Sequence, residues 1–239
     1  MKPLRLALLE LPARFGAKDA ALAHARELAL AAPADLVLLP EACLTGYVSP
    51  RGDFDLRPLA EERGGPTERA LSTLAKEAGT HLVAPLVERA EKDVFYNTML
   101  VFDRGGEVVA SYRKRHPWYP ERWASPGPER PPVFEVDGWA TTIAICFDVH
   151  TLAEDARAEL ERADLLLFPT AWVEEPEDDL RNDLLPPLAR RFGLVIANAN
   201  WAAGDVVIPG QGRSRVIGRD GAVIALATST RLDVTLEPS

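Results

Sequence analysis

The chain has 239 residues, 47% hydrophobic and 26% charged, which is enough to bury the core of a globular protein. Its formal net charge of −9 argues against nucleic acid or an anionic membrane surface as the main partner. Two cysteines and four scattered histidines make neither a disulfide framework nor a zinc site, and no apolar run suits a signal peptide or a membrane span. We therefore expect a cytoplasmic protein with reduced thiols.

Short apolar runs alternate with helical patterns along the first half of the chain. We expect a helix at Asp19–Ala32 and another that Thr67 caps and Gly79 ends. The expected strands and hairpin of this half are Leu4–Glu10, Asp35–Pro40, His81–Val87 and the hairpin Tyr96–Lys114.

The second half repeats the order of the first. The segment "DLLLFP" (Asp164–Pro169) copies "DLVLLP" (Asp35–Pro40) almost letter for letter. The other expected elements are strands Ala140–Cys146 and Leu194–Ala199, helices Leu152–Ala163 and Asp183–Gly193, and the hairpin Ser214–Ala227. This echo predicts one domain over residues 1–239, an α/β four-layer αββα sandwich built from two similar halves with mixed sheets.

Three reactive side chains follow three different expected strands. Glu41, Lys114 and Cys146 each lie where a strand ends, which is where α/β sheets carry their ligands. Each residue alone is more often structural or solvated than catalytic. Together they supply the parts of acyl transfer, because the carboxylate can take the thiol proton, the thiolate can attack a carbonyl, and the cation can stabilise the oxyanion.

The segments around these residues resemble the nitrilase superfamily, also called the carbon–nitrogen hydrolases. They are "DLVLLPEACLTGY", "YRKRHPWYPERWASPG" and "TTIAICFDVH", in family order, and the likeness extends over nearly the whole chain. The resemblance implies the αββα sandwich, Cys146 as the nucleophile, Glu41 as the general base and Lys114 as the oxyanion-binding cation. It further implies that the backbone N–H of Phe147 helps to bind the oxyanion and that Glu121 is a second glutamate of the site.

The resemblance favours hydrolysis of a small non-peptide amide to a carboxylate and ammonia or an amine through a cysteine thioester. Cys-Phe-Asp stands where true nitrilases usually have Cys-Trp-Glu, which favours amides over nitriles. Val149 and His150 stand where members that bind a substrate carboxylate often carry arginine, so such substrates are less supported. No metal or organic cofactor is implied. A homodimer is expected, although the chain ends sooner after its last expected strand than many relatives do.

Several neighbouring residues have more than one interpretation. Cys146 is expected near a helix N-terminus, which would favour thiolate, and Asp148 is expected to cap that helix. Cys43 is interpreted as a structural thiol, and His150 as either a pocket or a surface residue. The aromatic candidates for a substrate pocket, with His150, are Tyr47, Trp118, Tyr119 and Trp172.

Three alternatives stay open from the sequence. The same triad could hydrolyse a nitrile or pass the acyl group to an amine. The chain could also be a member of the family that binds a ligand without catalysis. The presence of all three reactive residues argues against this alternative. A dinucleotide-binding fold is the remaining alternative, but neither GxGxxG nor a P-loop is present.

Overall fold

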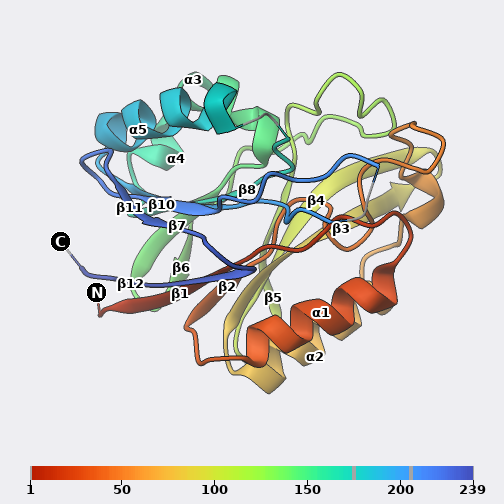
Figure 1. Ribbon diagram of the computed structural model, residues 1–239, viewed down its shortest axis with the longest axis horizontal. Helices are drawn as coiled ribbons and strands as arrows, with labels where there is room; N and C mark the ends of the chain where they lie inside the picture. The colour runs from red at the N-terminus through yellow and green to blue at the C-terminus, as the bar shows by residue number, and fades with distance from the viewer. Residues whose placement is uncertain (1, 174–175, 205–206, 239) are drawn as a thin grey trace.

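The computed structural model describes residues 2–173, 176–204 and 207–238. Two mixed sheets of six strands each pack face to face, and helices cover their outer faces (Figure 1). The predicted four-layer αββα sandwich is confirmed. Within the described residues, no helix combines the length and the apolar character needed to cross a membrane.

The first sheet has the strand order β12-β1-β2-β3-β4-β5. Strands β1, β2 and β3 run parallel, and the other neighbours in this sheet are antiparallel. Strands β4 and β5 form the predicted first hairpin. The bounds are β1 (Leu4–Leu9), β2 (Leu36–Leu38), β3 (His81–Glu91), β4 (Val94–Phe102), β5 (Val108–Arg113) and β12 (Arg231–Leu236).

The second sheet has the order β11-β10-β9-β8-β7-β6 and repeats this plan. Strands β7, β8 and β9 run parallel, and β10 and β11 form the predicted second hairpin. The bounds are β6 (Phe134–Val136), β7 (Trp139–Ile143), β8 (Leu165–Pro169), β9 (Val195–Ala199), β10 (Arg215–Ile217) and β11 (Val223–Leu226). The two nearly identical segments are β2 and β8, which occupy equivalent central positions.

Two strands have no counterpart among the expected elements. β6 pairs antiparallel with β7, and β12 pairs antiparallel with β1 in the sheet of the opposite half. The C-terminal strand therefore returns to the beginning of the chain, and both ends lie side by side in Figure 1. β6 is too short, and β12 too polar, to show the apolar run by which the other strands were recognised.

The helices divide between the two outer faces. Helices α1 (Lys18–Leu30) and α2 (Pro66–Ala78) cover the first sheet, whereas α3 (Leu152–Asp155), α4 (Arg157–Leu160) and α5 (Arg181–Phe192) cover the second (Figure 1). Three short 3₁₀ segments are η1 (Arg57–Leu59), η2 (Cys146–His150) and η3 (Pro176–Asp178).

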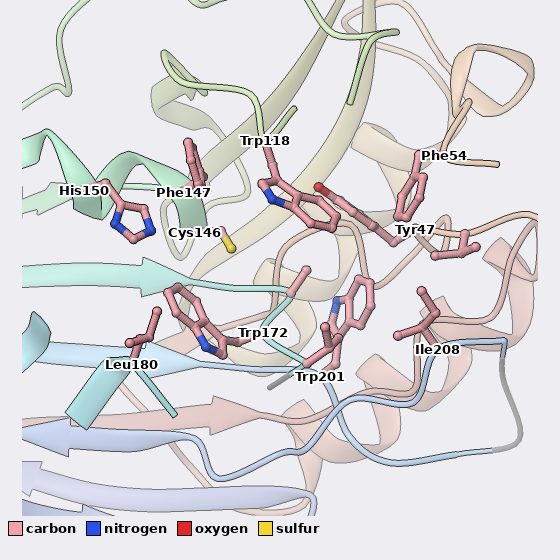
Figure 2. A pocket seen from close by; sticks show the side chains of 13 residues that line it. Tyr47, Phe54, Trp118, Cys146, Phe147, His150, Trp172, Leu180, Trp201 and Ile208 are labelled. Atoms are coloured by element: carbon pink, nitrogen blue, oxygen red, sulfur yellow. The ribbon is translucent and has the colours of Figure 1, made fainter. Parts of the chain in front are cut away.

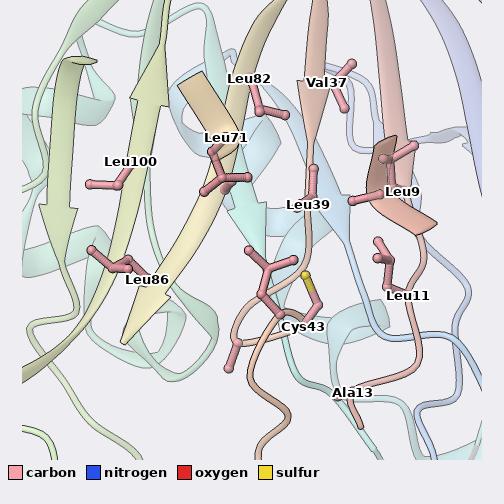
Figure 3. Close-up of a cluster of buried hydrophobic side chains, with 14 of the residues drawn as sticks. Leu9, Leu11, Ala13, Val37, Leu39, Cys43, Leu71, Leu82, Leu86 and Leu100 are labelled. Atoms are coloured by element: carbon pink, nitrogen blue, oxygen red, sulfur yellow. The ribbon is translucent and has the colours of Figure 1, made fainter. Parts of the chain in front are cut away.

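Three apolar layers hold the sandwich together. The middle layer joins the facing sides of the two sheets, with residues such as Leu6 and Leu38 from one sheet and Leu165 and Ile143 from the other. A second layer packs the first sheet against α1 and α2 (Figure 3), and a third packs the second sheet against α3–α5. Cys43 is fully buried in the second layer, as its structural interpretation predicts.

The expected helix ends are only partly correct. Gly79 ends α2 in the left-handed region (φ +59°), as predicted, because glycine adopts this conformation at low cost. Thr67 does not cap α2, since Gly65 is the N-cap residue and the Thr67 N–H and hydroxyl both donate to the Glu61 carboxylate. The expected helix over Leu152–Ala163 is interrupted at Ala156, whose ψ of 31° separates α3 from α4.

The loop that follows β2 depends on one glycine. Gly46 has φ +75°, and a Cβ atom there would lie 2.5 Å from the backbone nitrogen of Phe15. Gly52 also has a positive φ, +79°, but a Cβ atom there would meet nothing within 4 Å. Alanine substitutions at Gly46 and Gly52 therefore separate the energetic cost of backbone strain from that of steric contact.

We expect Gly46→Ala to lower the free energy of unfolding much more than Gly52→Ala does. The control should lose about 1–2 kcal/mol for the left-handed conformation alone. Gly46→Ala should lose roughly a further 1–3 kcal/mol, because the Phe15 backbone must move. Urea denaturation of both variants measures the difference. Equal losses would show that the close approach at Phe15 does not constrain this loop.

Candidate active site

The ends of strands from both sheets bring the reactive residues together. Glu41 lies just beyond β2, Lys114 directly follows β5, and Cys146 begins η2 shortly after β7. The Lys114 Nζ atom lies 2.7 Å from Glu41 Oε1 and 2.5 Å from Glu121 Oε2. All three of these charged side chains have 0% exposure, so the ion pairs are completely shielded from solvent. The charges of Lys114 and Glu41 both act on the Cys146 thiol.

Asn97 joins the two carboxylates and was not among the predicted site residues. Its Nδ2 atom donates to Glu41 Oε1 and to Glu121 Oε1, at 2.8 Å each. The backbone N–H of Trp118 donates to Glu121 Oε2 at 2.7 Å, and the Trp201 indole donates to the Glu41 backbone carbonyl at 2.6 Å. A polar residue within the buried part of β4 is the one sequence signal that could have identified Asn97.

Glu41 keeps one carboxylate oxygen unoccupied. Oε1 accepts from Lys114 and Asn97, whereas the buried Oε2 has no hydrogen-bond partner among the described residues. Burial raises the pKa of Glu41 above its usual value, against the opposing effect of the Lys114 charge. An acceptor with a raised pKa and one free oxygen is suited to take and return a proton.

Lys114 remains an ammonium despite its burial. Burial lowers its pKa, but the negative charges of Glu121 and Glu41 outweigh this effect and raise the pKa overall. A fixed cation in a site closed to water is a strong stabiliser of developing negative charge.

The Cys146 backbone is held in an uncommon conformation. Its φ is +44°, in the left-handed region that non-glycine residues rarely occupy. Strain of this kind persists only where the surroundings enforce it, and it is frequent at functional sites. The half-buried side chain reaches the wall of a cavity (Figure 2).

The expectation that the surroundings of Cys146 favour thiolate is wrong for the resting site. Burial raises the pKa of the thiol well above its usual value, and the negative charge of Glu41 raises it further. The Lys114 charge and a hydrogen bond from the backbone of Ala171 lower the pKa, but by less. The segment η2 has only five residues, which leaves little helix dipole to oppose burial.

Asp148 connects the cysteine to the lysine and, as expected, caps the helical turn that begins at Cys146, although that turn is the short η2 and not α3. Its carboxylate accepts from the Ile145 N–H at 3.0 Å, from the His116 N–H at 2.9 Å and from the Tyr112 hydroxyl at 3.0 Å. Tyr112 and His116 flank Lys114, so this one buried carboxylate joins the turn of Cys146 to the chain on both sides of Lys114. The N-cap residue of α3 is Thr151.

A cavity of about 360 Å³ opens beside Cys146 (Figure 2). Four of the predicted pocket residues, Tyr47, Trp118, His150 and Trp172, line it. His150 is exposed and also lines the cavity, so it is both a pocket residue and a surface residue. Tyr119 does not line the cavity: its side chain is 77% exposed and packs only edge-on against Trp118.

Sequence reasoning missed other parts of the wall. The lining residues that were not predicted as substrate-binding are Val48, Phe54, Phe147, Ala171, Val173, Leu180, Trp201 and Ile208, besides Cys146 itself. They come from loops far apart in the chain, which no local pattern relates. In the described part of the chain, no cluster of three or more His, Cys, Asp or Glu side chains is arranged to hold a metal ion.

The chain is similar to known hydrolases along nearly its whole length. The family model for carbon–nitrogen hydrolases matches residues 5–236. A protein described as "Hydrolase in pqqF 5'region", from Pseudomonas protegens, is 31% identical over 95% of this chain and 80% of its own. The 2-oxoglutaramate amidase of Bacillus subtilis is 31% identical over 80% of this chain and 73% of its own.

A solved structure is also similar to this chain along nearly its whole length. The amidase from Nesterenkonia sp. superposes with a TM-score of 0.86 at 28% identity, covering 98% of this chain and 90% of the amidase. In a variant of that amidase, the acetamide moiety of fluoroacetamide is covalently added to the active-site cysteine. With the family match over residues 5–236 and the shared fold, this chain belongs to the carbon–nitrogen hydrolases of the nitrilase superfamily.

Proposed function

We propose that this protein hydrolyses a small, uncharged, non-peptide amide through a thioester at Cys146. The observation that carries the proposal is the buried, unoccupied Oε2 atom of Glu41, whose charge acts on the Cys146 thiol while Oε1 is held by Lys114 and Asn97. A base, a nucleophile and a fixed cation converge in one site, in which the charged side chains are buried and the thiol opens onto the cavity. The amidases among the relatives support the same class of reaction.

In the first half of the reaction, Glu41 takes the proton of the Cys146 thiol, and the sulfur attacks the carbonyl carbon of the amide. The oxyanion that forms is stabilised by the Lys114 ammonium and the backbone N–H of Phe147. Glu41 then returns the proton to the amide nitrogen, the C–N bond breaks, and ammonia or an amine leaves. The acyl group remains bonded to Cys146 as a thioester.

In the second half, Glu41 takes a proton from water, and the resulting hydroxide attacks the thioester carbonyl. The same donors stabilise the second oxyanion. The C–S bond breaks, the proton on Glu41 returns to the Cys146 sulfur, and a carboxylic acid leaves and ionises. Glu121 orients Lys114 in both halves, because its carboxylate holds the ammonium at 2.5 Å.

The same residues could act on a nitrile or transfer the acyl group to an amine. The Cys-Phe-Asp sequence from Cys146 to Asp148 is the feature that favours the amide over the nitrile. We further propose one domain over residues 1–239, a homodimer and a cytoplasmic location. The half-exposed apolar side chains of edge strand β11, Val223 and Ile224, support a second copy, and light scattering in solution tests it.

The amide reaction is tested by the release of ammonia. We expect kcat/KM for a small neutral amide to exceed that for the nitrile of the same carbon skeleton, with Cys146→Ala inactive on both. Release should be accompanied by the matching carboxylate in equal amount. A higher kcat/KM for the nitrile would overturn the amidase assignment. Full activity of Cys146→Ala would exclude a thioester intermediate at this residue.

Alkylation should distinguish the two cysteines. We expect iodoacetamide to modify Cys146 before Cys43, because Cys146 opens onto the cavity, whereas Cys43 is completely buried among apolar side chains and its pKa is raised by burial. Peptide mass mapping at increasing times measures the order. Modification of Cys43 first would contradict Cys146 as the nucleophile.

The pH profile should report the raised pKa of Glu41. A carboxyl group whose pKa is raised stays protonated, and therefore useless as a base, over a wider acid range. We expect kcat/KM to fall with decreasing pH along a limb whose midpoint lies above 4.5, the usual value for glutamate. Steady-state rates between acid and neutral pH measure this limb.

Glu41→Gln supplies the second half of that test, and Glu62→Gln its control, since Glu62 is exposed at the surface. Loss of the base should lower kcat/KM about 10²–10⁴-fold, whereas the control should keep both the rate and the acid limb. An acid limb centred at or below 4.5, or a Glu41→Gln variant that keeps most of its activity, would exclude Glu41 as the base.

A further inference from the structure

We propose that the acyl group of the natural substrate is uncharged, apolar and large enough to contain an aromatic ring. This inference rests on the proposed amide hydrolysis and specifies its substrate class. It follows from three properties of the cavity beside Cys146: its volume, the arrangement of the rings in its wall, and the absence of Asp, Glu, Lys and Arg side chains from the described wall.

The cavity is much larger than a short aliphatic amide requires. Its volume is about 360 Å³. A dry apolar cavity of about 150 Å³ already binds benzene in another protein. An acyl group on Cys146 would extend directly into this space, because the sulfur points into the cavity (Figure 2). A methyl group would leave most of the volume without contacts, whereas a ring with a short linker would fill it.

The aromatic side chains of the wall form two separate clusters. Tyr47 packs against Phe54, Trp118 and Trp201, with ring centroids 5.3–6.4 Å apart. In the second cluster, the His150 ring is tilted against Phe147, at 4.7 Å, and stacked on Trp172, at 6.3 Å.

Figure 2 shows Cys146 between the two clusters. A planar group held there would have rings on both sides, an arrangement that favours aromatic contacts.

Two polar atoms of the first cluster are engaged inside the protein, those of Trp201 and Tyr47. The Trp201 indole donates to the Glu41 carbonyl, and the Tyr47 hydroxyl bonds to Glu121. These two rings therefore present carbon to the cavity. Across the described residues, the wall contains no Asp, Glu, Lys or Arg side chain.

The charges behind Cys146 disfavour an anionic acyl group. Two carboxylates, Glu41 and Glu121, surround the single ammonium of Lys114, which leaves an excess of negative charge. A substrate carboxylate would lose its hydration in this cavity, meet no cation in the described wall, and be repelled by that excess. An apolar acyl group meets none of these costs.

A matched series of amides tests the proposal: acetamide, butanamide, hexanamide, phenylacetamide and succinamate. We expect kcat/KM to rise about fourfold for each methylene group that becomes buried. Phenylacetamide should exceed acetamide by about 10- to 100-fold. Succinamate should lie below butanamide by about tenfold or more, because its carboxylate is desolvated without a partner. Release of ammonia gives each rate.

The outcomes separate the two proposals. If no amide of the series releases ammonia, the proposed function fails. If acetamide is hydrolysed as efficiently as phenylacetamide and hexanamide, or if succinamate is preferred, the enzyme is an amidase but the substrate class proposed here is wrong.

Variants of the second cluster test the role of its rings. Trp172→Ala should lower the ratio of kcat/KM for phenylacetamide to that for acetamide by about tenfold or more. Trp172→Phe should restore most of this ratio. His150→Ala, at an exposed position where truncation leaves the core intact, should lower it about threefold.

Tyr119→Ala is the matched control, because its ring belongs to the same part of the chain as Trp118 but lies outside the cavity. It should leave the ratio of the two kcat/KM values unchanged. An unchanged ratio in both Trp172→Ala and His150→Ala would overturn the proposal, as would an equal fall of the ratio in the control.

Discussion

The Lys114 ammonium, fixed between two buried carboxylates, is the interaction on which the rest of the site depends. Removing an ammonium and two carboxylates from water is costly, and the mutual attraction offsets that cost only with close geometry and further hydrogen bonds. Asn97 and the Trp118 N–H supply such bonds. The ends of β2 and β5 and the interior of β4 must therefore meet within hydrogen-bond distance, so these buried charges can be paired only with the strand order of the first sheet.

Cys146, the proposed nucleophile, belongs to the other sheet, so the packing of the two sheets decides where it lies. Leucine and isoleucine side chains between the sheets fix their separation. Asp148 adds a specific link, because its carboxylate receives hydrogen bonds from the turn of Cys146 and from residues on both sides of Lys114. A buried carboxylate with three donors is satisfied only in this arrangement, so it opposes any sliding of the cysteine turn away from the lysine.

Chemistry and selectivity are divided between two sides of Cys146. Behind it lie the ionised groups, which are closed to water and able to move a proton and hold a negative charge. In front of it lies an aromatic cavity, whose described wall contributes surface to bind an acyl group and no charge to attract one. The raised pKa values of the Cys146 thiol and of Glu41 have the same cause, burial, so both groups are set for proton exchange within one site.

The sequence by itself determined the four-layer fold and the meeting of Glu41 and Lys114, because strand periodicity, an internal echo and strand-end positions are local signals that the backbone preserves. Glu121 follows no strand directly, and only the family resemblance implied it. Only the tertiary structure decided that Asn97 bridges the carboxylates, that Asp148 also links the turn of Cys146 to the chain around Lys114, and that Trp201 lines the cavity whereas Tyr119 faces solvent. Hydrogen-bond partners and burial depend on which distant segments pack together, and a residue's neighbours in the chain do not specify its neighbours in space.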